Sequence, residues 1–209
     1  MCNTSLSSNH PFVVAITGGM GSGKTTVSHC FEELGVPCYC ADKVAADYYY
    51  DKKFIQQLCV IFGRKIFDAK GMPDKKQIAQ IVFGDKIKLT QLNSLIHPRV
   101  MNDFEKWCNN HRDVPYVLFE SAIIFENNLQ NSFDKIICVC APIDLRIRRI
   151  LKRDDTTTEL AQNRIDNQLS DEWKKEHSDY VLYNQYGPKH RQKSVEKIHN
   201  KILKSIANK

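Results

Sequence analysis

The segment that most constrains this chain is a glycine-rich stretch near its start, residues 18–25, with the sequence Gly-Gly-Met-Gly-Ser-Gly-Lys-Thr. It fits the pattern G-x-x-x-x-G-K-[ST] at every fixed position. An apolar run, Phe12–Thr17, precedes it, and residues with helical spacing follow from Lys24. Glycines allow a tight turn whose backbone N–H groups point inward, and a helix N-terminus adds partial positive charge. The stretch therefore predicts a site for the phosphates of a nucleotide.

Two side chains of this loop have expected roles. Lys24 can reach the β- and γ-phosphates of ATP, and the Thr25 hydroxyl can ligate Mg²⁺. We therefore predict ATP and Mg²⁺ as cofactors. The pattern leaves open where the phosphate goes: to water, to a protein, or to the hydroxyl group of a small molecule.

Length and composition indicate one sizeable globular domain with insertions. The chain has 209 residues, of which 42% are hydrophobic and 26% charged. No apolar stretch approaches the roughly 18 residues of a membrane span. The first eleven residues lack a basic region followed by an apolar one, so we expect no secretory signal and a cytoplasmic protein.

The formal charge of +6 is concentrated at the end of the chain. Residues 189–209 hold seven Lys or Arg against the single Glu196. The apolar residues of this tail follow helical spacing, which predicts an amphipathic helix with a basic outer face. We favour a solvated face over a patch for nucleic acid or membrane, which would need a denser cluster. The apolar residues are Val195, Ile198, Ile202 and Ile206.

The eight cysteines include two Cys-x-Cys pairs in apolar runs, Cys38/Cys40 and Cys138/Cys140. Residues i and i+2 of a strand share a face. Because no zinc-type spacing accompanies these pairs, we favour small buried side chains over a four-thiolate metal site.

Apolar runs alternate with helix-period segments, a pattern typical of a parallel sheet wrapped by helices. Helical spacing dominates the long interval 54–110, in which we predict breaks at 62–63, 70–73 and at His97-Pro98. The economical interpretation is an α/β core with a helical insertion. A helix is expected over Lys24–Leu34, and strands are expected at Phe12–Thr17, Pro37–Cys40, Tyr116–Glu120, Lys135–Cys140 and Tyr180–Tyr183.

Two carboxylates lie at strand ends, one as the last strand residue and one just past it, where ligands bind in open parallel sheets. Asp42 could accept the proton of an attacking hydroxyl, or it could cap the helix that begins after it; the residue alone does not decide between them. Glu120 could assist Mg²⁺, but here we favour a solvated strand end.

A polar segment late in the chain carries five arginines within about twenty residues. Transfer of a phosphoryl group spreads negative charge over phosphate oxygens, which guanidinium groups are well shaped to meet. We predict two helices joined by an exposed turn, acting as a lid that closes over the nucleotide and expels water. The arginines are Arg146, Arg148, Arg149, Arg153 and Arg164.

Taken together, these segments resemble the dephospho-coenzyme A kinase family over nearly the whole chain. The phosphate loop with its doubled glycine is similar, as are the segments that follow it in order. These are Leu34-Gly35-Val36-Pro37 with Ala41-Asp42, Gly71-Met72-Pro73-Asp74, Ile78-Ala79 with Val82-Phe83, Leu92–Pro98, Ile123–Asn127, Arg149 with Arg153-Asp154, Arg164 with Gln168, and Ser178–Val181 with Asn184 and Gly187.

The resemblance implies a P-loop kinase that phosphorylates the ribose 3′-hydroxyl of dephospho-coenzyme A, with a nucleotide-binding core, a helical acceptor domain and a lid. By position, Asp42 would take the hydroxyl proton, Arg149 and Arg153 would neutralise the transferred phosphoryl group, His97 would support acceptor binding, and Asn184 would lie near the adenine. The nucleotide ligands would be Gly19, Met20, Gly21, Ser22, Gly23, Lys24, Thr25 and Thr26. The core would span 12–53, 111–143 and 178–209, the acceptor subdomain 54–110 and the lid 144–177.

The chain departs from the family pattern at several positions. Cys40 stands where the first Asp of Asp-Ala-Asp is usual, Ala122 where proline is common, Lys75 where arginine is frequent, and Arg146 where glutamine is common. Two other functions fit the phosphate loop: a kinase of the same fold for another small molecule, and an ATP sensor without transfer. Retention of Lys24, Asp42 and the lid arginines argues against the sensor.

Overall fold

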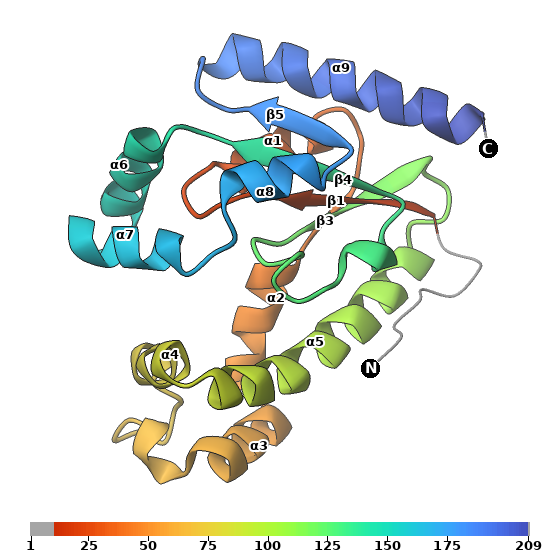
Figure 1. Ribbon diagram of the computed structural model, residues 1–209. Helices are drawn as coiled ribbons and strands as arrows, with labels where there is room; N and C mark the ends of the chain where they lie inside the picture. The colour runs from red at the N-terminus through yellow and green to blue at the C-terminus, as the bar shows by residue number, and fades with distance from the viewer. Residues whose placement is uncertain (1–10, 209) are drawn as a thin grey trace. The chain divides into compact units, whose positions relative to one another are not determined.

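The computed structural model describes residues 11–208 (Figure 1). Its internal contacts divide the chain into two compact units. One unit comprises the described residues up to Cys40 together with those from Trp107 onward; the other is Ala41–Lys106. The second unit holds most of the predicted helical insertion and also residues 41–53.

The first unit is built on a five-stranded parallel sheet with the order β2-β3-β1-β4-β5. All five predicted strands are confirmed; only β2 differs, starting one residue late because Pro37 has no N–H to donate to the ladder. The register pairs Ile16 with Glu120, which brings the carboxyl ends of β1 and β3 together. The strands are β1 (Phe12–Thr17), β2 (Cys38–Cys40), β3 (Tyr116–Glu120), β4 (Lys135–Cys140) and β5 (Tyr180–Tyr183).

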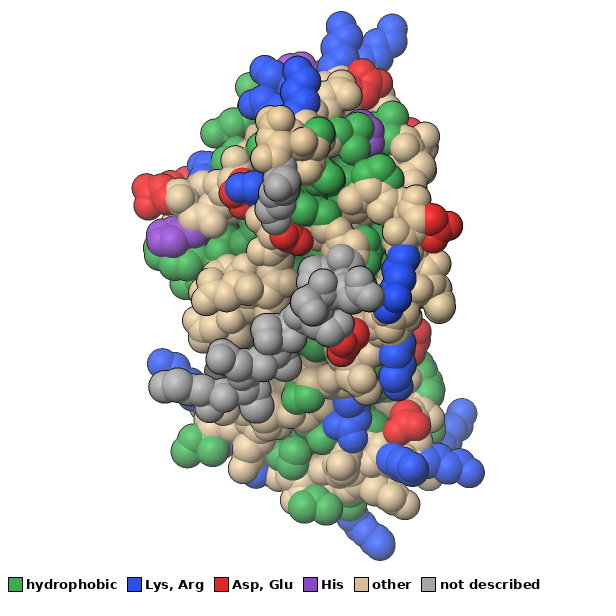
Figure 2. Space-filling view, turned by 90° about the vertical axis from the view of Figure 1, so that its right-hand side faces the viewer, with side chains coloured by type: hydrophobic (Ala, Val, Ile, Leu, Met, Phe, Trp, Pro, Cys, Tyr) green, Lys and Arg blue, Asp and Glu red, His purple; other side chains and the backbone are tan. Residues whose placement is uncertain are grey.

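Helices α1 (Lys24–Glu32) and α9 (Pro188–Ala207) pack together on one face of this sheet, and the short helix α8 (Asp171–Glu176) contacts β4 (Figure 1). Side chains of alternate residues in β1, β3, β4 and β5 form the core beneath α1 and α9. The predicted amphipathic tail is confirmed, because Val195, Ile198 and Ile202 are buried. Lys and Arg side chains project at the top of Figure 2, where α9 lies.

The arginine-rich segment forms two helices, as predicted: α6 (Ile143–Arg153) and α7 (Thr158–Asp166). The Thr157 hydroxyl caps α7 by accepting a hydrogen bond from the Leu160 N–H. Ile150, Ala161 and Ile165 are buried between the two helices, and Met20 of the phosphate loop packs against this small cluster. The helix pair therefore has a core of its own that contacts the loop.

The second unit is helical. Its core gathers residues of α3, α4 and the first half of α5, together with Ile66. The predicted breaks at 62–63 and 70–73 fall between helices. The elements are α2 (Ala41–Asp47), the 3-10 helix η1 (Tyr48–Tyr50), α3 (Lys52–Phe62), η2 (Arg64–Ile66), α4 (Lys75–Gly84) and α5 (Lys86–Asn109), whose last residues extend into the first unit.

The predicted break at His97-Pro98 is wrong, because Pro98 lies inside α5. Proline removes one intrahelical hydrogen bond and disfavours a helix interior. Leu92 before it and Val100 after it are both buried, so packing holds the helix on each side. The Arg99 guanidinium also donates to the Leu95 carbonyl at 2.7 Å, next to the disrupted turn. Tertiary burial therefore outweighs the local cost of the proline.

Of the four Cys-x-Cys thiols, those of Cys138 and Cys140 are buried in β4, with their sulfurs 3.5 Å apart. Within residues 11–208, no group of three or more His, Cys, Asp or Glu side chains has the geometry of a metal site. No helix in the same range is long and apolar enough to cross a membrane.

Candidate nucleotide-binding site

The phosphate loop connects β1 to α1, in the place that the sequence predicts. Gly18, Gly21 and Gly23 have positive φ angles of 145°, 77° and 89°, which other residues rarely adopt. A side chain at Gly18 would also collide with the Val139 carbonyl oxygen of β4, only 2.1 Å from an ideal Cβ. These glycines are therefore required by the backbone of the loop and by its packing against β4.

A cavity of about 550 Å³ opens at this loop. Four cationic side chains line it and no acidic side chain does, so its field favours a multiply charged anion such as a polyphosphate. Lys24 donates to the Gly18 carbonyl at 3.1 Å, which folds its side chain back over the loop. The lining residues are Gly21, Gly23, Lys24, Thr25, Thr26, Arg149, Ile150, Arg153, Asn184 and Arg191.

Arg149 reaches the loop from α6. Its guanidinium donates to the carbonyls of Gly21 and Ser22 at 3.2 and 3.0 Å and to that of Asn184 at 2.8 Å. The pKa of Arg149 is lowered by burial and by the nearby charge of Arg191. The predicted residue Arg149 thus lies at the cavity while also holding the loop backbone.

Asn184 follows β5 and is buried. Its side-chain amide nitrogen donates to the Ser22 carbonyl at 2.9 Å, and its side-chain oxygen Oδ1 accepts from Arg191 at 3.3 Å. Asn184 therefore links the phosphate loop to the first turn of α9. Sequence reasoning missed Arg191, for which the only signal was a basic residue seven positions after Asn184.

Arg153, at the end of α6, also lines the cavity but is largely exposed. It makes two hydrogen bonds to Asp154, at 2.8 and 3.1 Å, which raise the pKa of Arg153 and lower that of Asp154. Such exposed ion pairs are worth little. The guanidinium can therefore exchange Asp154 for a phosphate group at small cost.

The preference for Glu120 as a solvated strand end is wrong. Glu120 is only 3% exposed, and its carboxylate accepts a hydrogen bond of 2.6 Å from the Thr25 hydroxyl. The parallel pairing of β3 with β1 brings the two side chains together. A buried carboxylate beside the loop threonine supplies hard oxygen donors of the type that Mg²⁺ prefers.

Asp42 is the second residue of α2 and is exposed. Because α2 begins at Ala41, Asp42 lies inside the first helical turn and not at the N-cap position before it. It belongs to the helical unit and follows the last residue of β2, Cys40, by two positions. In that unit His97 is half-buried in α5, and burial lowers the pKa of its imidazole, which favours the neutral form.

A parallel sheet, a glycine-rich loop opening a helix, and a cationic cavity beside them define a P-loop nucleotide-binding protein of the small-molecule kinase class. A sequence model described as dephospho-CoA kinase matches residues 12–189. The chain therefore belongs to the dephospho-CoA kinase family, and the resemblance seen in the sequence is confirmed.

Individual relatives agree with this assignment. The dephospho-CoA kinase of Fusobacterium nucleatum is 36% identical over 186 residues, which cover 89% of this chain and 96% of the relative. That of Bacteroides fragilis is 37% identical over 82% of this chain and 83% of its own length. The crystal structure of TT1252 from Thermus thermophilus matches with a TM-score of 0.82 and 27% identity, covering 92% of this chain and 97% of its own. Dephospho-CoA kinase from Campylobacter jejuni, at 22% identity and a TM-score of 0.63, shares the fold.

Proposed function

We propose that this protein transfers the γ-phosphoryl group of ATP to the ribose 3′-hydroxyl of dephospho-coenzyme A, giving coenzyme A and ADP, the last step of coenzyme A synthesis. Membership of the family supports the acceptor, and the cavity lined by Lys24, Arg149, Arg153 and Arg191 supports the donor. Because family membership supports dephospho-coenzyme A as the acceptor, we favour this function over a kinase for another alcohol and over an ATP sensor. A cytoplasmic location remains our expectation.

In the reaction, the 3′-oxygen forms a bond to the γ-phosphorus while the bond from that phosphorus to the leaving oxygen of ADP breaks. We assign Asp42 as the acceptor of the hydroxyl proton. Lys24 and the N–H groups of the loop bind the phosphates, and Arg149 and Arg153 meet the charge on the transferred group. We keep His97 as a support for the acceptor and Asn184 as a neighbour of the nucleoside; segment 144–177 would be the lid and 54–110 the acceptor subdomain.

The oxygen donors of Thr25 and Glu120 fit Mg²⁺, because a hydroxyl and a buried carboxylate already lie 2.6 Å apart beside the phosphate loop. Thr25 would hold the ion directly, and Glu120 would orient Thr25 or a metal-bound water. The chemistry that Mg²⁺ would supply there is neutralisation of the negative charge on the phosphates.

The deciding experiment measures ADP release with ATP and Mg²⁺ in the presence of dephospho-coenzyme A, adenosine, AMP or no acceptor. We expect turnover only with dephospho-coenzyme A, and coenzyme A as the product by mass. Turnover with a different acceptor would replace the substrate but keep the kinase. ATP binding without turnover on any acceptor would favour the sensor instead.

Replacing Glu120 by Gln should raise the Mg²⁺ concentration needed for half-maximal activity by about 10-fold, the usual scale for a group that orients a metal ligand. The amide still accepts a hydrogen bond from Thr25 but loses its charge. Activity is measured over a Mg²⁺ titration at saturating ATP. Glu33→Gln, an exposed position at the end of α1, is the matched control. Identical Mg²⁺ requirements in Glu120→Gln and wild type would remove Glu120 from the metal site.

A further inference from the structure

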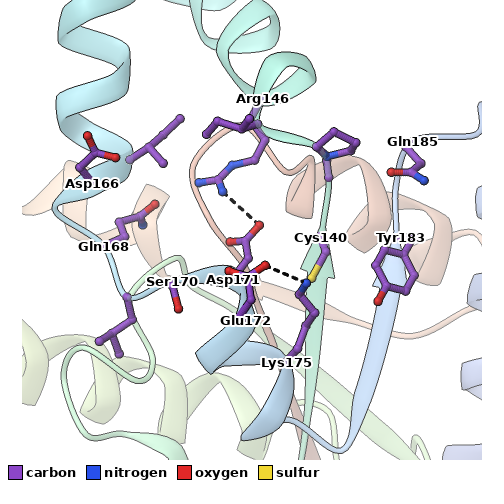
Figure 3. A pocket seen from close by; sticks show the side chains of 15 residues that line it. Cys140, Arg146, Asp166, Gln168, Ser170, Asp171, Glu172, Lys175, Tyr183 and Gln185 are labelled. Atoms are coloured by element: carbon purple, nitrogen blue, oxygen red, sulfur yellow. Dashed lines mark hydrogen bonds and ion pairs between the residues drawn. The ribbon is translucent and has the colours of Figure 1, made fainter.

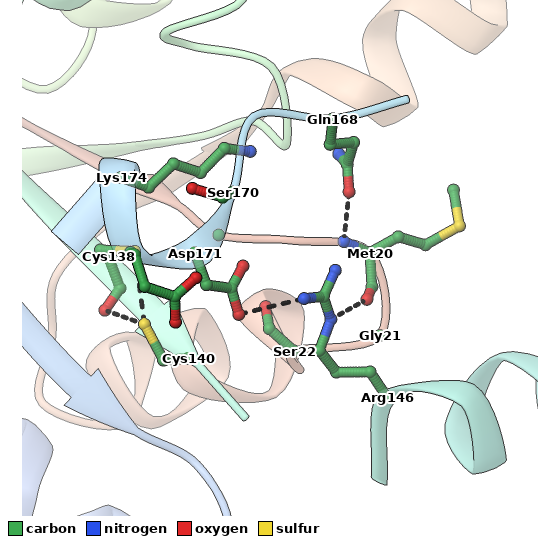
Figure 4. Close-up of polar contacts among 12 residues, drawn as sticks. Met20, Gly21, Ser22, Cys138, Cys140, Arg146, Gln168, Ser170, Asp171 and Lys174 are labelled. Atoms are coloured by element: carbon green, nitrogen blue, oxygen red, sulfur yellow. Dashed lines mark hydrogen bonds and ion pairs between the residues drawn. The ribbon is translucent and has the colours of Figure 1, made fainter. Parts of the chain in front are cut away.

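Both backbone polar groups of one loop residue, Met20, are bonded to side chains of the segment 144–177 (Figure 4). The Met20 carbonyl accepts a hydrogen bond of 2.8 Å from Arg146 Nε, and the Met20 N–H donates to the Gln168 side chain at 2.7 Å. The loop is therefore held from outside, at the residue before Gly21.

Arg146 is itself fixed in place. It is only 5% exposed, and its guanidinium forms an ion pair with Asp171 at 3.0 Å. Figure 3 shows this pair in a second cavity, of about 620 Å³, which shares no lining residue with the nucleotide cavity. Arg146 therefore does not line the nucleotide cavity, and its buried donors are used within the protein.

The hydrogen bond to Met20 sets the direction of the next N–H group. In a trans peptide, the carbonyl of Met20 and the N–H of Gly21 point in opposite directions. Because the Met20 carbonyl points at Arg146 Nε, the Gly21 N–H points away from that guanidinium. Gly21 lines the nucleotide cavity, whereas Met20 does not.

Gly19 provides the space for this arrangement. A Cβ at Gly19 would lie 2.1 Å from the terminal nitrogen Nη2 of Arg146 and 2.5 Å from its Cζ. Gly19 does not have a positive φ angle, so its backbone conformation does not require glycine. Glycine is required at position 19 because the Arg146 guanidinium lies so close to it. The bonds of that guanidinium to Asp171 and Met20 prevent it from moving aside.

We propose that Arg146 is a positioning residue of the phosphate loop. Its ion pair with Asp171 fixes the guanidinium, and the absence of a side chain at Gly19 leaves room for it. In this position it holds the Met20 carbonyl and keeps the Gly21 N–H directed at the nucleotide's phosphates. The proposal rests on one part of the proposed function, the binding of ATP. It does not depend on which acceptor is phosphorylated. It also gives a role to the arginine that stands where the family commonly has glutamine.

The test is a double-mutant cycle with Gly19→Ala and Arg146→Ala, read by equilibrium binding of ATP, ADP and adenosine. Arg146→Ala should weaken ATP and ADP binding by about 10-fold or more, the scale for misplacing one donor to a charged group, and leave adenosine unaffected. Gly19→Ala should cause a similar loss. The double variant should bind no more weakly than Arg146→Ala, because alanine at 146 removes the collision.

Two further variants test whether the loss of binding has another cause, either the unpaired Asp171 carboxylate or the loss of a positive charge. Arg146→Ala leaves the Asp171 carboxylate without its cation, so the combined change Arg146→Met with Asp171→Leu removes the whole pair, which is often tolerated in a folded protein. It should show the same loss for ATP. Lys152→Ala, exposed on the same helix, also removes one positive charge and should bind all three ligands as wild type does.

Three results would overturn the proposal: ATP binding within twofold of wild type in both Arg146 variants, an equal loss for adenosine, or a double variant in which the two single losses multiply. Failure of the proposed function would look different. In that case the wild-type protein binds ATP and shows the cycle described above, yet does not phosphorylate dephospho-coenzyme A.

Discussion

Replacing Asp42 by Asn is expected to lower kcat by about 100-fold or more while leaving ATP binding largely intact, the usual scale for losing a general base. Asn has nearly the same shape and can still accept a hydrogen bond, but it cannot take a proton from the attacking hydroxyl at neutral pH. Asp42 lies within the first turn of α2, whereas the competing role requires the N-cap position before that turn. Steady-state kinetics with dephospho-coenzyme A and direct ATP binding measure the two quantities.

Asp47→Asn is the matched control, since Asp47 is an exposed carboxylate at the other end of the same short helix. It should retain wild-type turnover. Equal activity of Asp42→Asn and wild type would show that another group takes the proton. A loss of ATP binding equal to the loss of turnover would instead assign Asp42 to the donor side.

The sheet and the phosphate loop were predictable because their signals are local. An apolar run of five or six residues that is buried on both faces, such as Lys135–Cys140, can be recognised without knowing its neighbours. The loop pattern between a strand and a helix is similarly self-contained. The helical spacing of the tail also predicted which side chains of α9 are buried, because amphipathic periodicity reports burial directly.

The parts that could not be predicted depend on contacts between distant segments. Whether Glu120 is solvated or buried depends on the pairing of β3 with β1, which sets it beside Thr25. The continuation of α5 through Pro98 depends on burial at both sides of the proline. A composition rich in arginine indicates a charged ligand but does not tell which guanidinium groups hold backbone carbonyls.

The arginines of α6 make this point most clearly. Arg146 and Arg149 are three residues apart on one helix, and both contact the phosphate loop. Arg149 lines the nucleotide cavity, whereas Arg146 lines the second cavity, and the two cavities share no lining residue. The helix therefore holds the loop from two sides, a division of roles that sequence spacing alone does not reveal.

Replacing Lys24 by Ala is expected to lower kcat/KM for ATP by about 100-fold to 1,000-fold, the range found when one preorganised donor to a developing charge is removed. Lys24 bonds the Gly18 carbonyl across the loop and lines the nucleotide cavity, so its loss removes both a phosphate ligand and a tie that shapes the loop. Both KM for ATP and kcat should therefore worsen, unlike in Asp42→Asn. Lys24→Arg should restore little, because a planar guanidinium does not replace a compact ammonium at this position. Lys152→Ala, exposed on α6, controls for the lost charge. Unchanged kinetics in Lys24→Ala would mean that the cavity at this loop is not where ATP binds.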